Sequence, residues 1–312
     1  MSHRDIEFSI VSGSDEEMLF ACLESLNTAM RASAHLNWVA TVTLGIDADD
    51  VSAKRIRRAF PHVRLLERSS KTGASAGHNE VLRASQARYV WLVDDNVVFL
   101  AGTVEMVVSY MDRPENSRVA LVGPQLLNPD GILARDGYAF PSMRRILFEQ
   151  SGVARFLNDP GPGGSTSEGA SVLGRGHDVD TAPGACVAVR LKAIRQTGAM
   201  TDDAPASGAE PEWHRRFREN GWRVVLLADA SVMYYGIRAS RQGHRQFHPE
   251  QLDGALYFFR TGRPLASFKL FCAALIAISG SRALAGWITR DHIEASTARQ
   301  YARRAWVGLL QR

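Results

Sequence analysis

The stretch Tyr89-Val-Trp-Leu-Val-Asp-Asp-Asn96 decides the fold of this chain. Its first five residues are strongly apolar, which is typical of a strand in the interior of a sheet. Two carboxylates and an amide follow at once, so polar groups stand at the carboxyl end of that strand. Ligands of open α/β sheets bind beyond the carboxyl ends of the strands. The stretch therefore predicts a buried strand that ends in a ligand site.

Strands and helices alternate around this stretch. Periodicity predicts strands over 8–11, 38–46, 63–66 and 89–93, with helices over 19–30, 51–60 and 76–87 between them. Further along, it predicts a strand over 186–189, helices over 191–197 and 212–220, and a strand over 222–227. The βαβαβαβ order of the first half favours a mostly parallel, twisted sheet flanked by helices. The Gly-, Ser- and Pro-rich segment 159–177 is predicted to be a loop of the lid type.

Composition is that of an ordinary soluble protein. The chain has 312 residues, of which 45% are hydrophobic and 22% charged, enough to bury a large core. Its three cysteines, Cys22, Cys186 and Cys272, stand far apart in apolar surroundings, so we expect buried thiols and no disulfide or metal cluster. The polar residues 1–7 do not resemble a secretion signal, and we expect a cytoplasmic location.

The C-terminal segment is basic. Residues 238–312 contain 12 Lys and Arg against 4 Asp and Glu, whereas the whole chain has a net charge of only +4. The segment includes the apolar run Leu270–Ile278, which is too short to span a bilayer but suits a core or interfacial helix. Without a recognisable nucleic-acid module, we expect no nucleic-acid partner. An anionic membrane surface is the favoured partner, and a solvated basic face is the alternative.

Asp94 and Asp95 are the first candidate site residues. Adjacent carboxylates at a strand end repel each other unless a cation or hydrogen-bond donors neutralise them. Oxygen ligands suit Mg²⁺ or Mn²⁺, which commonly bridge a diphosphate. The alternative is a simple turn whose acidic residues cap a helix.

Two further segments carry candidate groups. Residues 71–79 (KTGASAGHN) lie between a strand and a helix, and their small side chains would let backbone N–H groups approach a phosphate; an ordinary tight connection is the alternative. Glu210 and Glu212 precede the predicted helix 213–220, where a carboxylate either caps the helix or acts as a general base.

In this order, the segments resemble glycosyltransferase family 2, particularly its rhamnosyltransferase-like bacterial members with the GT-A fold. The resemblance covers roughly residues 8–240. It is carried by Ile10-Val-Ser-Gly-Ser14, Asp47, 71–79 with Gly73, Gly77 and Asn79 retained, 122–131 (VGPQLLNPDG), 180–189 (DTAPGACVAV) and 216–224 (RFRENGWRV).

The resemblance implies a GT-A domain over 1–240, with a nucleotide-binding half at about 1–125 and an acceptor-side half at about 126–240. A helical, basic extension would occupy 241–312. It implies a donor nucleotide sugar contacted by Ser12, Asp47, Gly73, Asn79 and Asp94, and a metal held by Asp94 and Asp95. Asp95 would position the sugar or the metal, and Glu210 would be the general base.

The departures from the family pattern fall on catalytic positions. The metal-binding Asp of the family is replaced by Asn96, and a His that many members supply after the last strand is replaced by Tyr234. Three options remain open: a metal held by the two aspartates, metal-free transfer, or an inactive relative. For metal-free transfer, basic residues after the last strand would neutralise the diphosphate: Arg238, Arg241, His244 and Arg245. A solvated basic loop is the alternative for these four.

The function that the resemblance implies is inverting transfer of a hexosyl or deoxyhexosyl group from a nucleotide diphosphate sugar. The acceptor would be a hydroxyl of a glycan, a lipid-linked oligosaccharide or a small glycoside, in polysaccharide biosynthesis at the membrane periphery. The alternative is a catalytically silent member that binds a nucleotide sugar or a partner enzyme. A nicotinamide enzyme is disfavoured because no Gly-rich fingerprint follows the first strand.

Overall fold

The computed structural model describes residues 5–12, 15–44, 50–67, 74–135, 137–151, 176–236 and 249–310. The strands are β1 (Ile6–Val11), β2 (Trp38–Leu44), β3 (Arg64–Glu67), β4 (Tyr89–Asp94), β5 (Val97–Phe99), β6 (Val119–Leu127), β7 (Leu133–Arg135), β8 (His177–Asp178), β9 (Cys186–Arg190) and β10 (Arg223–Tyr234). The α-helices are α1 (Glu16–Ala32), α2 (Asp50–Ala59), α3 (Ala74–Ala84), α4 (Thr103–Asp112), α5 (Met143–Gln150), α6 (Leu191–Thr197), α7 (Ala206–Glu219), α8 (Pro249–Gly262), α9 (Leu265–Ile288) and α10 (His292–Leu310), and Pro114–Asn116 form a 3₁₀ turn.

The chain divides into two compact units. The first, here the sheet unit, comprises Met1–Tyr138, Ser165–Asp202 and Trp213–Ser240. The second, here the helical unit, comprises Ala139–Gly164, Asp203–Glu212 and Arg241–Arg312. The helical unit thus gathers two internal segments beside the C-terminal one, and α7 belongs to both units. The predicted boundary at residue 240 stays a prediction.

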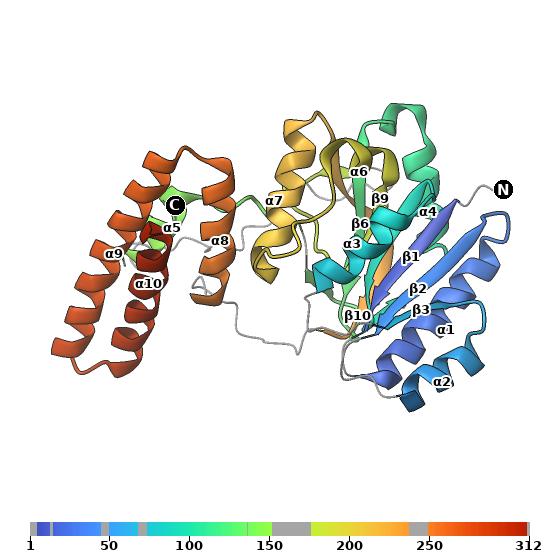
Figure 1. Ribbon diagram of the computed structural model, residues 1–312, viewed down its shortest axis with the longest axis horizontal. Helices are drawn as coiled ribbons and strands as arrows, with labels where there is room; N and C mark the ends of the chain where they lie inside the picture. Colours follow the sequence, from blue (N-terminus) through green and yellow to red (C-terminus); the bar gives the residue numbers. More distant parts are fainter. Residues whose placement is uncertain are drawn as a thin grey trace. The chain divides into compact units, whose positions relative to one another are not determined.

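The sheet runs in the order β3-β2-β1-β4-β9-β6-β10-β5, with β7 and β8 on the flanks (Figure 1). The four strands predicted from the first half are parallel to one another. Beyond them β9 runs antiparallel between β4 and β6, so the second half of the sheet is mixed. The predicted α/β class, with helices on the sheet and a helical C-terminal segment, is confirmed.

Each face of the sheet is covered by helices. Side chains of α1, α2 and α4 cover one face, where they pack on alternate residues of β1 and β4. Side chains of α3, α6 and α7 cover the other face, where they meet the intervening residues of β4. Figure 1 shows α1 and α2 on the side of the sheet opposite to α3. The period-2 alternation of a strand thus divides the apolar run of β4 between two cores.

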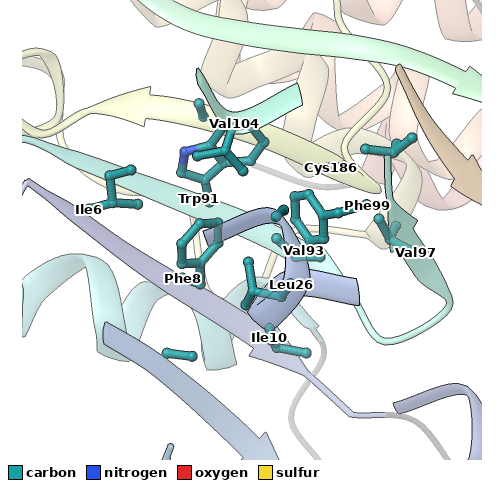
Figure 2. Close-up of a cluster of buried hydrophobic side chains, with 14 of the residues drawn as sticks. Ile6, Phe8, Ile10, Leu26, Trp91, Val93, Val97, Phe99, Val104 and Cys186 are labelled. Carbon is teal, nitrogen blue, oxygen red and sulfur yellow. The ribbon is translucent and has the colours of Figure 1, made fainter. Parts of the chain in front are cut away.

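The centre of the first core is aromatic. The Phe8 ring lies 5.7 Å from the Trp91 ring and 5.9 Å from the Phe99 ring, between centroids. Figure 2 shows these rings packed with Ile10, Val93 and Leu26. Tilted and edge-on aromatic contacts add to the stabilisation that burial provides. Because Phe99 belongs to β5, this cluster also anchors the turn that follows β4.

The helical unit has a core of its own. Side chains of α5, α8, α9 and α10 form it, among them Phe259, Phe268, Leu275 and Tyr301. The apolar run predicted at 270–278 proves to be part of the 24-residue helix α9, which is long and apolar enough to cross a membrane by length and composition. The nine-residue run by itself is still too short to span a bilayer, and the helix is longer because it continues through small residues such as Gly280 and Ala283.

Candidate functional site

The carboxyl ends of β1 and β4 lie side by side. The parallel register pairs Val11 with Asp94 on one side of β1 and with Thr43 on the other. The Ser12 N–H donates to the Thr43 carbonyl over 2.9 Å and extends the β1–β2 ladder by one bond. Ser12 and Asp94 were predicted to share a site, and the structure places both at this edge of the sheet.

The turn after β4 brings the two unusual positions together. Asp95 and Asn96 form the turn between β4 and β5, and β5 pairs antiparallel with β10 so that Val97 stands opposite Tyr234. The Tyr235 N–H donates to the Asn96 carbonyl over 3.0 Å. Positions 96 and 234 are 138 residues apart in sequence but neighbours in space.

Gly236 packs tightly against Asn96 and Tyr234. A β-carbon at this position would stand 2.5 Å from the Asn96 amide nitrogen and closer still to the Tyr234 ring. A side chain here would therefore displace both residues. The Asn96 amide oxygen is buried and has no hydrogen-bond partner in the part of the chain that the structure describes. Such a carbonyl oxygen, beside two carboxylates, is a potential acceptor for a donor group or a cation.

The two carboxylates influence the core beneath them. Cys22 is fully buried and its thiol lies 3.9 Å from the Asp94 carbonyl oxygen. Burial raises the pKa of the Cys22 thiol well above its ordinary value, and the charges of Asp95 and Asp94 raise it further. The pKa of Cys186 is raised for the same main reason. Cys22, Cys186 and Cys272 are all buried and free, so the prediction of buried thiols is confirmed.

Asn79 is fully buried in α3 and holds a distant segment. Its amide nitrogen donates to the Met200 carbonyl over 2.7 Å and to Asp202 Oδ1 over 2.6 Å. Its amide oxygen accepts from the Met200 N–H over 3.0 Å. One turn further along α3, Arg83 pairs with the same Asp202 carboxylate over 2.8 Å. These bonds fasten α3 to residues 200–202, and contact between Asn79 and a nucleotide stays a prediction.

A second buried hydrogen bond joins α3 to strand β1 of the sheet. His78 shares a 2.9 Å hydrogen bond between its Nδ1 and the Ser9 hydroxyl of β1. Burial lowers the pKa of His78 to about 4, so the ring is neutral near pH 7. The sequence held no signal for this pair, since 69 residues separate its members.

Glu210 lies inside a helix. The prediction that it precedes the helix was wrong, because α7 already begins at Ala206 and includes Pro211. The early start is stabilised by close packing within the helical unit, where a β-carbon on Gly208 would meet the Gly254 backbone of α8 at 2.8 Å. Because α7 begins at Ala206, Glu210 lies in the second turn of the helix, beyond the first turn where the helix dipole acts most strongly. Its side chain is half-buried.

Several predicted site residues lie outside the described part of the chain: Asp47, Gly73, Arg238, Arg241, His244 and Arg245, together with most of the loop 159–177. Within the described part, no group of three or more His, Cys, Asp and Glu side chains is placed to hold a metal ion. Among the described residues, those that bring side-chain oxygens to the turn after β4 are Asp94, Asp95 and Asn96. An all-oxygen set suits Mg²⁺ or Mn²⁺, although an amide binds less strongly than a third carboxylate.

The sheet order, with carboxylates at the carboxyl end of β4, is that of the open α/β class, whose members bind ligands beyond the carboxyl ends of the strands. Residues 4–255 match the family described as Glycosyltransferase like family 2, so the chain belongs to this family. A search of curated proteins found no match to the sequence.

Solved structures agree on the fold. The structure of GalNAc-T7 with UDP, GalNAc and Mn²⁺ is similar with a TM-score of 0.56 at 9% identity, over 83% of this chain and 48% of that one. This chain thus spans about half the length of that protein. The mannosyltransferase PcManGT from Pyrobaculum calidifontis, in complex with GDP-Man and Mn²⁺, is similar with a TM-score of 0.50 at 13% identity, over 99% of this chain and 88% of that one. At such identities the likeness shows the GT-A fold alone.

Proposed function

We propose that this protein transfers a sugar from a nucleotide diphosphate sugar to an acceptor hydroxyl, with inversion at the anomeric carbon. The proposal rests on one juxtaposition in a chain of this family: Ser12, Asp94, Asp95 and Asn96 meet at the carboxyl edge of the sheet, with Tyr234 beside them. That edge is where α/β sheets bind nucleotides. The two structural neighbours were solved with a nucleotide or a nucleotide sugar, which supports a ligand of this class.

The donor side must stabilise a departing diphosphate. Asp94, Asp95 and the Asn96 oxygen would hold a divalent cation, and that cation would supply positive charge to the leaving group. The chain itself contributes the turn that presents these oxygens, which β5 and the Phe99 ring hold in place. With Asn96 in place of a third carboxylate, the turn carries one negative charge fewer. We therefore expect weak cation binding, and greater reliance on the basic residues that follow β10.

The acceptor side needs a general base. We assign this role to Glu210, which would take the proton from the acceptor hydroxyl as that oxygen attacks the anomeric carbon from the face opposite the diphosphate. A carboxylate is a sufficient base because the hydroxyl becomes acidic only as the new bond forms. Its half-buried place on a regular helix would fix the direction in which it accepts the proton.

The acceptor that we propose is a growing glycan or a lipid-linked glycoside, used in polysaccharide biosynthesis. The helical unit supports this choice, since its described C-terminal part is rich in apolar and basic side chains. A membrane-bound acceptor would be reached most easily by an enzyme whose own surface has affinity for lipid.

Glu210→Gln tests the assigned base. The change removes the basic oxygen, keeps the size of the side chain, and should reduce the release of nucleoside diphosphate from UDP-, GDP- and dTDP-sugars about 10²-fold or more when acceptor is present. Glu219→Gln is the matched control, because it makes the same change on an exposed part of the same helix. Full turnover by Glu210→Gln would exclude Glu210 from the mechanism.

A catalytically silent, nucleotide-sugar-binding subunit is the second candidate. The closeness of Asn96 and Tyr234 favours it, because both replace groups that would bind a metal in the family and the structure places both beside Gly236. Binding of a nucleotide sugar without turnover, under every acceptor and cation condition, would identify this function.

A further inference from the structure

Exposed apolar side chains are concentrated on α9 and α10. Of the thirteen large hydrophobic residues described as exposed, nine belong to these two helices: Leu265, Leu270, Leu284, Trp287, Ile288, Ile293, Trp306, Val307 and Leu310. Soluble proteins rarely gather so many on one substructure, and such patches mark an interaction site.

The outward side of α9 forms a continuous stripe. Leu270, Ala273, Ala277, Leu284 and Ile288 are all exposed and recur at intervals of three, four or seven residues, so they lie on one side of the helix. The opposite side packs into the core of the helical unit through Phe268, Phe271, Cys272 and Leu275. The stripe contains no charged residue along its length. A helix that faced only water would carry charges there.

The turn that joins α9 to α10, taken as residues 287–293, carries both exposed apolar side chains and a basic one. Trp287 is 72% exposed and Ile293, at the start of α10, is 82% exposed. Between them stands Arg290, which is exposed and adopts a positive φ of 58°. Tryptophan beside arginine is typical of segments that enter the interface of a lipid bilayer, where the ring is half immersed and the guanidinium meets headgroups.

Acidic side chains of the helical unit over 251–310 make contacts within that unit. Glu294 accepts a 2.8 Å hydrogen bond from Arg282, which also contacts Gln150. Asp253 pairs with Arg304, and Asp291 accepts the Glu294 N–H at the start of α10 over 3.0 Å. Residues 251–310 contain eight Lys and Arg against three Asp and Glu, and Arg263, Arg290, Arg299 and Arg303 are exposed. The apolar surface is therefore accompanied by positive charge.

We propose that α9 and α10 dock this protein onto an anionic lipid surface, with the apolar stripe of α9 and the Trp287–Ile293 turn immersed in the interface. The helices lie in the membrane plane and do not cross it. A spanning α9 would carry the Arg282–Glu294 pair into hydrocarbon, and its partner α10 would present Arg299 and Arg303 to lipid tails, which is costly.

The positive charge of these helices also indicates whether a second copy of this chain or a lipid surface binds the apolar stripe. A second copy of this chain would carry the same excess of positive charge in these helices, and like charges oppose association. An anionic bilayer offers the complementary charge to these basic side chains. Lipid is therefore the occupant that the charges favour.

Leu284→Asp tests the proposal in co-sedimentation of the full-length protein with vesicles. Leu284 is 58% exposed in the middle of the stripe, so a carboxylate there should not disturb the core. Vesicles of phosphatidylcholine with phosphatidylglycerol should bind the wild-type protein, and the substitution should weaken the partition coefficient about tenfold or more. Pure phosphatidylcholine vesicles should bind more weakly, and raised salt should reduce the difference between the two lipids.

Ile132→Asp is the matched control, since Ile132 is 64% exposed and lies in the sheet unit. This substitution should leave vesicle binding unchanged. Circular dichroism would verify that both variants keep their helices. Equal vesicle binding by Leu284→Asp and wild type would overturn the proposal. So would a dimer in sedimentation velocity that Leu284→Asp dissociates without any vesicle binding by the wild type, because the stripe would then bind a second copy. Transfer to a soluble acceptor does not require docking, so failure of this proposal leaves the proposed reaction intact.

Discussion

Replacing Asn79 with alanine separates a structural role of this residue from a ligand contact. The amide of Asn79 is wholly buried and makes three hydrogen bonds, two with the backbone of Met200 and one with the Asp202 carboxylate. Alanine removes all three. The Met200 N–H and carbonyl would then stay buried without their present partner, while Asp202 keeps its ion pair with Arg83.

The expected loss follows from the buried groups. Each of the two buried backbone groups left without a partner costs about 1–3 kcal/mol, so Asn79→Ala should lower the free energy of unfolding by about 2–6 kcal/mol. Urea unfolding followed by circular dichroism measures this quantity. Arg83→Ala is the control: its ion pair with Asp202 is more than one-third exposed on both sides, and its loss should cost about 0–1 kcal/mol.

A role in donor binding has a different signature. If Asn79 contacts the nucleotide and contributes little to stability, Asn79→Ala would unfold like the wild type and bind nucleoside diphosphates more weakly. Wild-type stability of Asn79→Ala, within about 0.5 kcal/mol, would refute the reasoning from its hydrogen bonds.

Three further substitutions test burial and close packing. His214 is fully buried, and burial lowers its pKa to about 3. Below pH about 6.5 the unfolded chain therefore takes up a proton that the folded chain does not, and the free energy of unfolding falls by about 2 kcal/mol from pH 7 to pH 5. His214→Phe should remove this part of the pH dependence, as measured by urea unfolding. A β-carbon on Gly254 would meet Ser207 at 2.5 Å, so Gly254→Ala should destabilise the protein by about 1–3 kcal/mol. Gly280 also lies in a helix, but a β-carbon there would meet no other atom, so Gly280→Ala should stabilise the protein by about 0.5–1 kcal/mol in urea unfolding. A Gly254→Ala variant more stable than Gly280→Ala would contradict the packing.

The strands and helices of the first half could be predicted because local pattern and tertiary structure agree there. The apolar run of β4 is buried on both faces, and its two carboxylates mark the end of the strand at the place where the sheet edge lies. The three-residue strand β5 was not predicted, since it is short and begins only one residue after the two aspartates. Its place is determined by pairing with β10, whose residues come more than 130 positions later.

The start of α7 and the partners of Asn79 show what local pattern omits. Gly208 and Pro211 are both poor helix formers, yet α7 includes them, because contact with Gly254 requires a residue without a side chain at position 208. Asn79 lies in a segment whose composition suggested a phosphate-binding connection, whereas the structure bonds it to residues 121 and 123 positions away. Long-range hydrogen bonds leave no trace in the spacing of one sequence.

The most direct measurement of the proposed site is calorimetric titration of UDP, GDP and dTDP, and then their sugar conjugates, into the wild-type protein and the Asp94→Asn variant, with Mn²⁺ and again with EDTA. Asp130→Asn, an exposed carboxylate in the turn after β6, is the matched control. We expect one nucleotide to bind the wild type and the control equally, and to bind Asp94→Asn at least about tenfold more weakly. Binding lost in EDTA would show that the aspartates hold a cation despite Asn96, and binding that survives EDTA would assign charge neutralisation to the basic residues after β10. Failure of every nucleotide and conjugate to bind the wild-type protein would contradict the proposed site at the sheet edge.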